Sequence, residues 1–183
     1  SGKAKLSTYL KADNQLYFNI RYNYNEELPV AETVDQAFVH YQKGGLSLYA
    51  IREAIGEDQV SAALRRLLSK HGAGKSKAFA KDFLQELYQD ASPDQIRFID
   101  EQLKKVITYA LKIKILSCKA LNKGQYQVQL QLNIGKNELQ NGKTKALAIN
   151  DDFDIALFDA QSKPYYLQKH HFLKNDNQIS IIL

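Results

Sequence analysis

The first hundred residues carry apolar side chains in steps of three and four, the spacing that places them on one face of an α-helix. Helices are therefore predicted over the opening twenty residues and, after the polar segment NYNEELPV (23–30), over residues 33–55. Thr33 and Gln36 have the spacing of a capping box, and Gly56 is a suitable stop. The apolar stripe of this second helix comprises Val34, Ala37, Phe38, Tyr41, Gly44, Gly45, Leu48, Ile51 and Ile55.

Three further helices follow in the same part of the chain. One spans residues 60–71 and ends at Gly72, and another is marked by apolar positions between 79 and 88. The last follows SPDQ (92–95), where Ser92 is a capping residue and Pro93 occupies the first helical position.

The hydrophobic period changes near residue 109, where apolar and polar residues begin to alternate. In QYQVQLQLNI (125–134) every second residue is apolar, which is typical of a half-buried strand. Turn signals such as Asn141-Gly142 separate this segment from further alternating ones. The sequence thus predicts a helical part over residues 1–108 and a small antiparallel β-sandwich over residues 109–183. The alternation is still running in NQISIIL (177–183), so we expect the sandwich to be truncated and the chain to be a piece of a longer protein.

Composition excludes several classes of function. The formal net charge is +5, but the basic residues form no block, which argues against a nucleic-acid partner. No apolar run approaches the roughly 18 residues of a membrane span, so no membrane contact is expected of this segment. Cys118 is the single cysteine, which rules out an internal disulfide but leaves the compartment unknown.

Three candidate motifs favour structural interpretations. HGAGKSK (71–77) lacks the first glycine of a phosphate-binding loop and follows a predicted helix, so it is interpreted as a helix end and a basic loop. The four histidines lack the partners of a metal site, because His40 and His71 have no histidine or carboxylate at i+4, and the neighbours His170 and His171 point to opposite faces of a strand. Cys118 is interpreted as a packed or idle thiol.

Tyr41 allows two interpretations. Its place on the apolar stripe favours a core tyrosine. However, Gly44 and Gly45 lie three and four positions further on, and two glycines inside a helix cost roughly 1 kcal/mol each relative to alanine. Without side chains there, a ligand or another backbone can approach the helix beside the phenol. A tyrosine hydroxyl in such a place can donate a hydrogen bond to a developing oxyanion.

The segment YQKGGLSLYAIREAIGEDQVSAALRRLLSKHG (41–72) resembles the zinc-dependent aminopeptidases related to aminopeptidase N. DFLQEL (82–87) resembles the next helix of that family, and DDFDIALFD (151–159) resembles the β-domain of a bacterial, transporter-associated branch. The resemblance implies that residues 1–108 are the second half of a thermolysin-like catalytic domain.

By this resemblance Tyr41 is the residue that stabilises the tetrahedral intermediate of peptide hydrolysis. The family's glutamate after this tyrosine is Gln42 here, and its Gly-Ala is Gly44-Gly45. The sequence contains no H-E-x-x-H motif, so the zinc ligands would lie in a parent protein, before Ser1. The implied partners are the N-terminal remainder of that parent and a peptide substrate. The fragment alone is expected to be inactive and to hold no metal.

An interpretation from another class stays open. The parent could have kept the peptidase fold and lost its zinc site, which would make this chain a non-enzymatic interaction or scaffolding module of a membrane transporter-associated protein. In either case a fragment is expected to expose apolar surface, so we also predict a homo-oligomer formed through an exposed helical face.

Overall fold

The computed structural model describes residues 2–24, 26–161 and 163–183, and for residues 2–5, 7 and 123 only the backbone is described. The chain separates into two compact units. The helical unit comprises the residues up to Ile107 together with Leu139–Lys143. The β unit comprises Thr108–Glu138 and Thr144–Leu183. The order of elements is helices followed by antiparallel sheets, as the sequence predicted.

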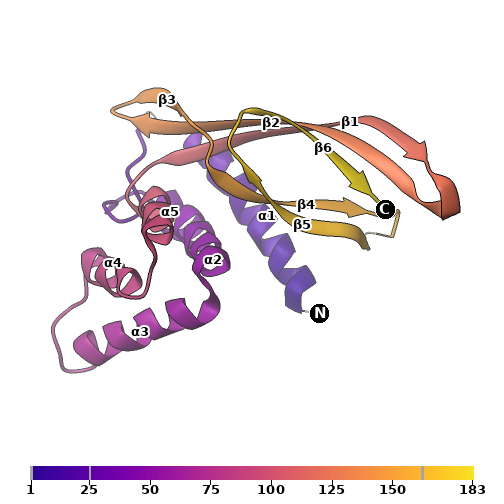
Figure 1. Cartoon of the computed structure of the whole chain (residues 1–183). Helices are drawn as coiled ribbons and strands as arrows, with labels where there is room; N and C mark the ends of the chain where they lie inside the picture. The colour runs from indigo at the N-terminus through magenta and orange to yellow at the C-terminus, as the bar shows by residue number, and fades with distance from the viewer. Residues whose placement is uncertain (1, 25, 162) are drawn as a thin grey trace. The chain divides into compact units, whose positions relative to one another are not determined.

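The helices of the first unit occur in the predicted order (Figure 1). A long opening helix is followed by a loop, a short π-helical segment and four α-helices. Their bounds are α1 (Gly2–Arg21), η1 (Val39–Lys43), α2 (Gly44–Ile55), α3 (Glu57–His71), α4 (Ala80–Tyr88) and α5 (Pro93–Leu103).

The helix ends confirm two predictions and correct a third. Ser92 accepts from the backbone N–H of Gln95 and forms the expected capping box at the start of α5. Gly56 follows α2 with a φ of 95°, a value that favours glycine. The capping box at Thr33 is wrong, because residues 33–36 are not helical. The Gln36 side chain instead bridges the preceding loop, donating to the carbonyl of Glu26 and accepting from the N–H of Leu28.

Two groups of buried side chains stabilise the helical unit. The larger lies among α2, α3, α4 and α5 and includes Ile51, Ala63, Leu84, Leu87, Ile99 and Leu103. The smaller joins Tyr17 of α1 to Phe38 and Val39 at the start of η1. This second group positions the segment that carries Tyr41.

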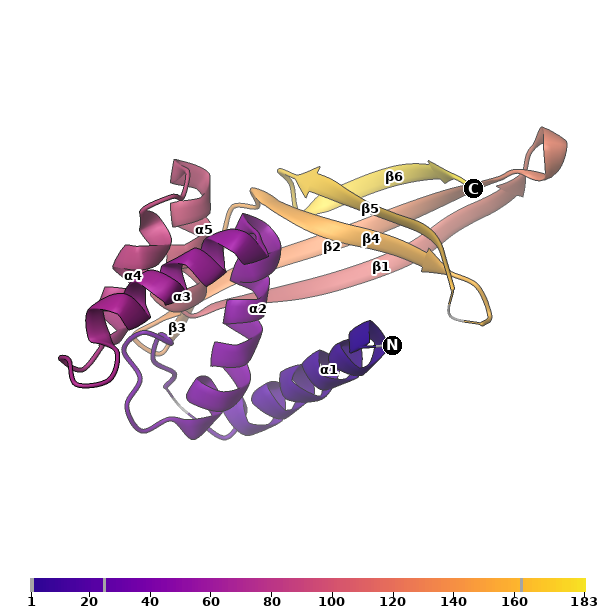
Figure 2. The ribbon, with the colours of Figure 1, turned by 90° about the horizontal axis from the view of Figure 1, so that it is seen from below.

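The β unit contains a four-stranded and a two-stranded antiparallel sheet (Figure 2). In the larger sheet β2 is central, with β1 on one side and β3 and β6 on the other. In the smaller sheet β4 pairs with β5, with Asp152 opposite His171. The bounds are β1 (Ile107–Ala120), η2 (Asn122–Gly124), β2 (Tyr126–Gln140), β3 (Lys143–Leu147), β4 (Asp151–Phe158), β5 (Pro164–Phe172) and β6 (Asp176–Ile182).

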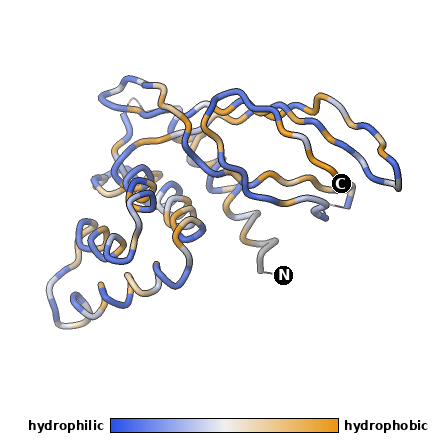
Figure 3. The backbone as a smooth tube through the Cα atoms, in the orientation of Figure 1, coloured by the Kyte–Doolittle hydropathy of each residue, from blue (hydrophilic) through white to orange (hydrophobic). Residues whose placement is uncertain are grey.

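Side chains from both sheets share one hydrophobic core. The predicted alternation along β2 is confirmed, since every second residue from Val128 to Ile134 is buried, and Figure 3 shows apolar and polar positions alternating along the strands. Ile155, Phe172 and Ile181 contribute to the same core from β4, β5 and β6.

The alternating segment in β1 behaves differently from β2. Its apolar residues Leu111, Ile113 and Ile115 are each more than half exposed. The hydrophobic pattern therefore predicted the strand but not the exposure of its apolar face.

Candidate functional site

Tyr41 lies in η1 and is 76% exposed to solvent. The interpretation of this residue as a core tyrosine is therefore wrong. The buried residues of the segment are instead Phe38 and Val39, followed in α2 by Ser47 and Ile51. Two other members of the predicted apolar stripe, Val34 and Leu48, are also exposed.

A π-helical turn accounts for the exposure of Tyr41. The N–H of Gly44 donates to the carbonyl of Val39, five residues earlier, where an α-helix would use a residue four positions back. This wider turn changes the phase of the helix between residues 39 and 43. A uniform 3.6-residue period predicts the wrong face there, and Tyr41 points outward.

The two glycines after the turn have different environments. Gly44 is buried, and a Cβ atom at this position would lie 3.4 Å from the carbonyl oxygen of Val39 and 3.8 Å from Cγ1 of Val30. Gly45 is exposed, and an added Cβ would meet nothing within 4 Å. Gly44 thus permits close packing at the end of the π turn, whereas Gly45 leaves open space beside Tyr41.

The π turn is anchored by a buried ion pair. Lys43, its last residue, is 7% exposed, and its ammonium group donates to the carboxylate of Glu27, which is 5% exposed. Glu27 also accepts from the Tyr17 hydroxyl at 2.9 Å and from Nε of Arg21 at 2.5 Å. We refer to these four residues as the Glu27 cluster. It ties α1 and the following loop to the segment that carries Tyr41.

Burial changes the proton affinity of two members of the Glu27 cluster. Loss of solvent contact lowers the pKa of Lys43, an effect that the charge of Glu27 opposes. Burial, and next the negative charge of Glu27, raise the pKa of Tyr17 above its ordinary value. Tyr17 therefore remains a hydrogen-bond donor to Glu27 well into the alkaline range.

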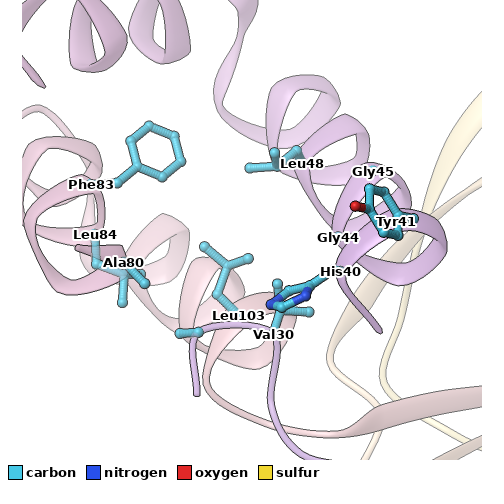
Figure 4. A pocket seen from close by; sticks show the side chains of 11 residues that line it. Val30, His40, Tyr41, Gly44, Gly45, Leu48, Ala80, Phe83, Leu84 and Leu103 are labelled. Atoms are coloured by element: carbon cyan, nitrogen blue, oxygen red, sulfur yellow. The ribbon is translucent and has the colours of Figure 1, made fainter. Parts of the chain in front are cut away.

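A pocket of about 350 Å³ lies beside Tyr41 (Figure 4). Leu84 and Leu103 are buried, whereas Tyr41 and Gly45 are exposed. In Figure 4 the Tyr41 hydroxyl lies on the side of its ring that faces the pocket. The remaining lining comes from Val30, Ala31, His40, Gly44, Leu48, Ala80 and Phe83.

His40 is the second polar side chain of the pocket. Its Nε2 lies 2.9 Å from the carbonyl oxygen of Thr33. Since a carbonyl oxygen can only accept, this nitrogen is the donor of the bond. The bond fixes the imidazole to the loop that precedes η1.

The other residues considered from the sequence lie elsewhere. His71 contacts Ser76, His170 lies 2.7 Å from the Tyr166 hydroxyl, and His171 pairs with Asp152 at 2.8 Å. Cys118 is an exposed free thiol rather than a packed one. The loop after α3 does follow a helix that ends at His71, as predicted.

Zinc, which the resemblance implies, needs three or more protein ligands of the His, Cys, Asp or Glu type. No group of three such side chains in the described part of the chain is arranged to hold a metal ion. Within those same residues, no helix combines the length and apolarity that crossing a bilayer requires. The side chains brought together at the candidate site are thus a phenol, an imidazole and a set of apolar groups.

Glu27 and Lys43 were not identified as important from the sequence. Glu27 lies in a polar loop, and its contacts with Lys43 and Tyr17 span 16 and 10 positions. A lysine directly before the two glycines was the only local signal. Comparison with family models, curated proteins and solved structures found no match for this chain.

Proposed function

We propose that this chain is the C-terminal section of a zinc-dependent aminopeptidase and contributes Tyr41 as an oxyanion-stabilising residue. The observation that carries the proposal is the position of the phenol. It is exposed at the edge of a pocket and lies on a turn fixed by a buried ion pair. This arrangement supports the role that the resemblance of residues 41–72 implies.

The chemistry assigned to Tyr41 is hydrogen-bond donation. When a peptide carbonyl is attacked, negative charge develops on its oxygen. A hydrogen-bond donor already held in place stabilises the transition state, which carries this charge, more than it stabilises the ground state. The Glu27 cluster supplies this rigidity, since it holds Lys43 two residues away from the phenol. The open space at Gly45 leaves room for the substrate.

Zinc would activate the attacking water in such an enzyme. The described residues of this chain do not form its ligand set, and we assign no step of the metal chemistry to them. The proposal places the ligands in an N-terminal remainder of the parent, on an H-E-x-x-H helix and a later glutamate, as in the resembled family.

The same proposal covers the architecture. The helical unit would be the second half of a thermolysin-like catalytic domain, as the resemblance of residues 41–72 implies. The β unit would be a small sandwich, which is supported by two antiparallel sheets that share one core. Exposed apolar residues of α3, Leu64 and Leu68, are available to the remainder of the parent or to a second copy.

The test is Tyr41→Phe in the longer protein that contains this chain. Loss of one oxyanion donor typically costs about 2.7–4 kcal/mol, so we expect kcat for aminoacyl-amide hydrolysis to fall roughly 100- to 1,000-fold. Tyr22→Phe is the matched control, since Tyr22 belongs to the same unit and is 91% exposed. Unchanged hydrolysis in Tyr41→Phe would overturn the proposal.

The purified 183-residue chain provides a second test. We expect it to bind no stoichiometric zinc and to hydrolyse no aminoacyl amide, whereas chelator-sensitive hydrolysis by the chain alone would contradict the proposal. A longer protein that folds normally but neither binds zinc nor cleaves peptides would favour the interaction module instead.

A further inference from the structure

The strand β1 forms one edge of the larger sheet. It is bonded to β2 on one side, and β3 and β6 lie beyond β2 (Figure 2). An edge strand has backbone N–H and C=O groups that point away from its sheet, and these can pair with a further strand. At 14 residues, β1 is much longer than the usual strand of about 5–6 residues. The β unit therefore has a long edge to which another extended segment can be added.

The side chains of β1 alternate between apolar and basic. Leu111, Ile113 and Ile115 are each more than half exposed, and Lys112 and Lys114 between them are exposed as well. Because successive side chains of a strand point to opposite faces, the apolar residues share one face of β1 and the two lysines share the other. Lysines commonly protect an edge strand against aggregation, but protection does not require a row of exposed apolar side chains. Such a row is typical of a surface that a partner covers.

The charge of this edge indicates an acidic partner. No aspartate or glutamate occurs between Glu101 and Glu138, a stretch that includes all of β1. Among the residues that the structure describes, no acidic side chain forms an ion pair with Lys112 or Lys114. Antiparallel pairing with β1 of a second copy would bring lysines opposite lysines, and like charges at opposite positions destabilise a sheet. A strand that carries acidic residues at these positions has the complementary charge.

We propose that β1 binds an extended segment in which acidic residues alternate with apolar ones, and that this segment adds to the sheet as a further strand. Its acidic side chains face Lys112 and Lys114, and its apolar side chains cover the exposed apolar face of β1. Backbone hydrogen bonds to the edge contribute affinity, and the alternation fixes the register, since a shift by one residue would place acidic groups on the apolar face. This site lies in the β unit and does not depend on the role proposed for Tyr41.

Binding of peptides to the 183-residue chain tests the inference. The probe is an acetylated and amidated peptide of about eight residues, a usual strand length, in which glutamate alternates with valine. The control peptide has the same composition with all its glutamates in one block. Because each cross-strand pair adds a small free energy, the alternating peptide should bind about 10-fold more tightly at low salt. Equal affinities would show that the edge attracts negative charge without pairing as a strand, and would overturn the inference.

Hydrogen exchange shows whether the bound peptide forms a strand. In an antiparallel pair the N–H groups of alternate residues point to the same neighbour, so every second N–H of β1 points away from β2. Peptide at about ten times its Kd should therefore slow exchange about 10-fold at every second residue between 111 and 115. Chemical-shift changes without this alternating protection would contradict strand addition. Protection of the same amides at high protein concentration without peptide would assign the edge to a second copy, and would also overturn the inference.

Reversal of the edge charge provides the decisive variant. Lys112→Glu combined with Lys114→Glu changes exposed side chains, so the variant is expected to fold. It should bind the glutamate peptide about 10-fold more weakly and prefer a peptide in which lysine alternates with valine. The matched control is Lys143→Glu with Lys145→Glu, which makes the same change at the same spacing on β3 of the same sheet and should bind like the parent chain. A β1 variant that still preferred the glutamate peptide, or an equal loss in the control, would show that the site is wrongly assigned.

Discussion

Each of the two units contains a buried lysine–carboxylate pair beneath a tyrosine. In the helical unit Lys43 pairs with Glu27, and Tyr17 donates to the same carboxylate. In the β unit Lys136 pairs with Asp151 at 3.0 Å, and Tyr109 donates to Asp151 at 3.1 Å. In both, the lysine ammonium lies 5.7 Å from the centre of the tyrosine ring.

The surroundings of the two pairs differ. Lys136 and Asp151 lie on strands, and Tyr109 packs against Phe153 next to the core of the β unit. Lys43 ends a π turn whose middle residue is the exposed Tyr41. A buried ion pair is weak evidence for function by itself, since its net contribution to stability is often small. The exposed phenol and the pocket beside it distinguish the Glu27 cluster from its counterpart.

The largest expected effect comes from removing either carboxylate. Glu27→Gln and Asp151→Asn each remove the charge of a carboxylate that a buried ammonium group contacts, so each should lower the free energy of unfolding of its own unit by about 3–5 kcal/mol. Hydrogen exchange in urea measures the two units separately. In native buffer only Glu27→Gln should accelerate exchange of the Gly44 amide, which closes the π turn. Equal acceleration in both variants would show that the Glu27 cluster does not hold this turn.

Replacement of Lys43 and of Lys136 should lower the free energy of unfolding by different amounts. In Lys43→Met the carboxylate of Glu27 keeps Arg21 as a second cation, and the cost should be that of one charged hydrogen bond, about 1.5–3 kcal/mol. Among the described residues, the other partners of Asp151 are the hydroxyl of Tyr109 and a backbone N–H, both neutral. Lys136→Met should therefore cost more, about 3–5 kcal/mol. Urea denaturation of the two variants tests this order, and the reverse order would contradict it.

Alkaline pH should lower the free energy of unfolding of the helical unit through Tyr17. Because burial and the charge of Glu27 raise the pKa of Tyr17, the unfolded chain loses this proton first, near pH 10. Above about pH 10 the folded state therefore binds more protons than the unfolded state, and the free energy of unfolding falls by up to about 1.4 kcal/mol per pH unit. The Tyr17→Phe variant has no hydroxyl to titrate at this position, so its free energy of unfolding lacks this pH-dependent decrease. Its stability relative to the parent chain should therefore rise with pH in this range, and a constant difference would count against the assignment.

The smallest expected effects distinguish the two glycines. Gly45→Ala should stabilise the helical unit by up to about 1 kcal/mol, because alanine favours helix and the added methyl group has open space. Gly44→Ala should gain less, since its methyl group would lie 3.4 Å from the carbonyl oxygen of Val39, at the lower limit of ordinary van der Waals contact. Thermal unfolding of the two variants measures this difference in stability. Equal gains would show that the close contact at Gly44 has no energetic consequence.

Much of the fold was predictable because local rules act over a few residues. The helical and alternating periods identified the helices and strands, and Ser92 with Gln95 marked the start of α5. The capping box at Thr33 failed because the side chain of Gln36 binds Glu26 and Leu28 in the neighbouring loop instead. Which partner the Gln36 side chain binds depends on the fold of the loop and cannot be predicted from residue spacing.

The candidate site was predictable only in part. Tyr41 and the two glycines were identified from the sequence, but a regular helical period placed Tyr41 on the buried face. The π turn reverses that expectation, and its two end residues make contacts that are distant in sequence: Val39 is buried with Tyr17, and Lys43 binds Glu27. The pocket was not predictable for the same reason, since its lining comes from four separate stretches of the chain.

The π turn also makes the length of this segment as important as its composition. Each residue of a helix advances the chain by about 100° of rotation, because an α-helix has 3.6 residues per turn. Deletion of a single residue between Val39 and Lys43 could restore an ordinary α-turn, yet it would rotate the preceding residues by that angle relative to α2. A substitution keeps the number of residues and therefore does not cause this rotation. A one-residue deletion here would instead move the phenol away from the face of α2 that lines the pocket.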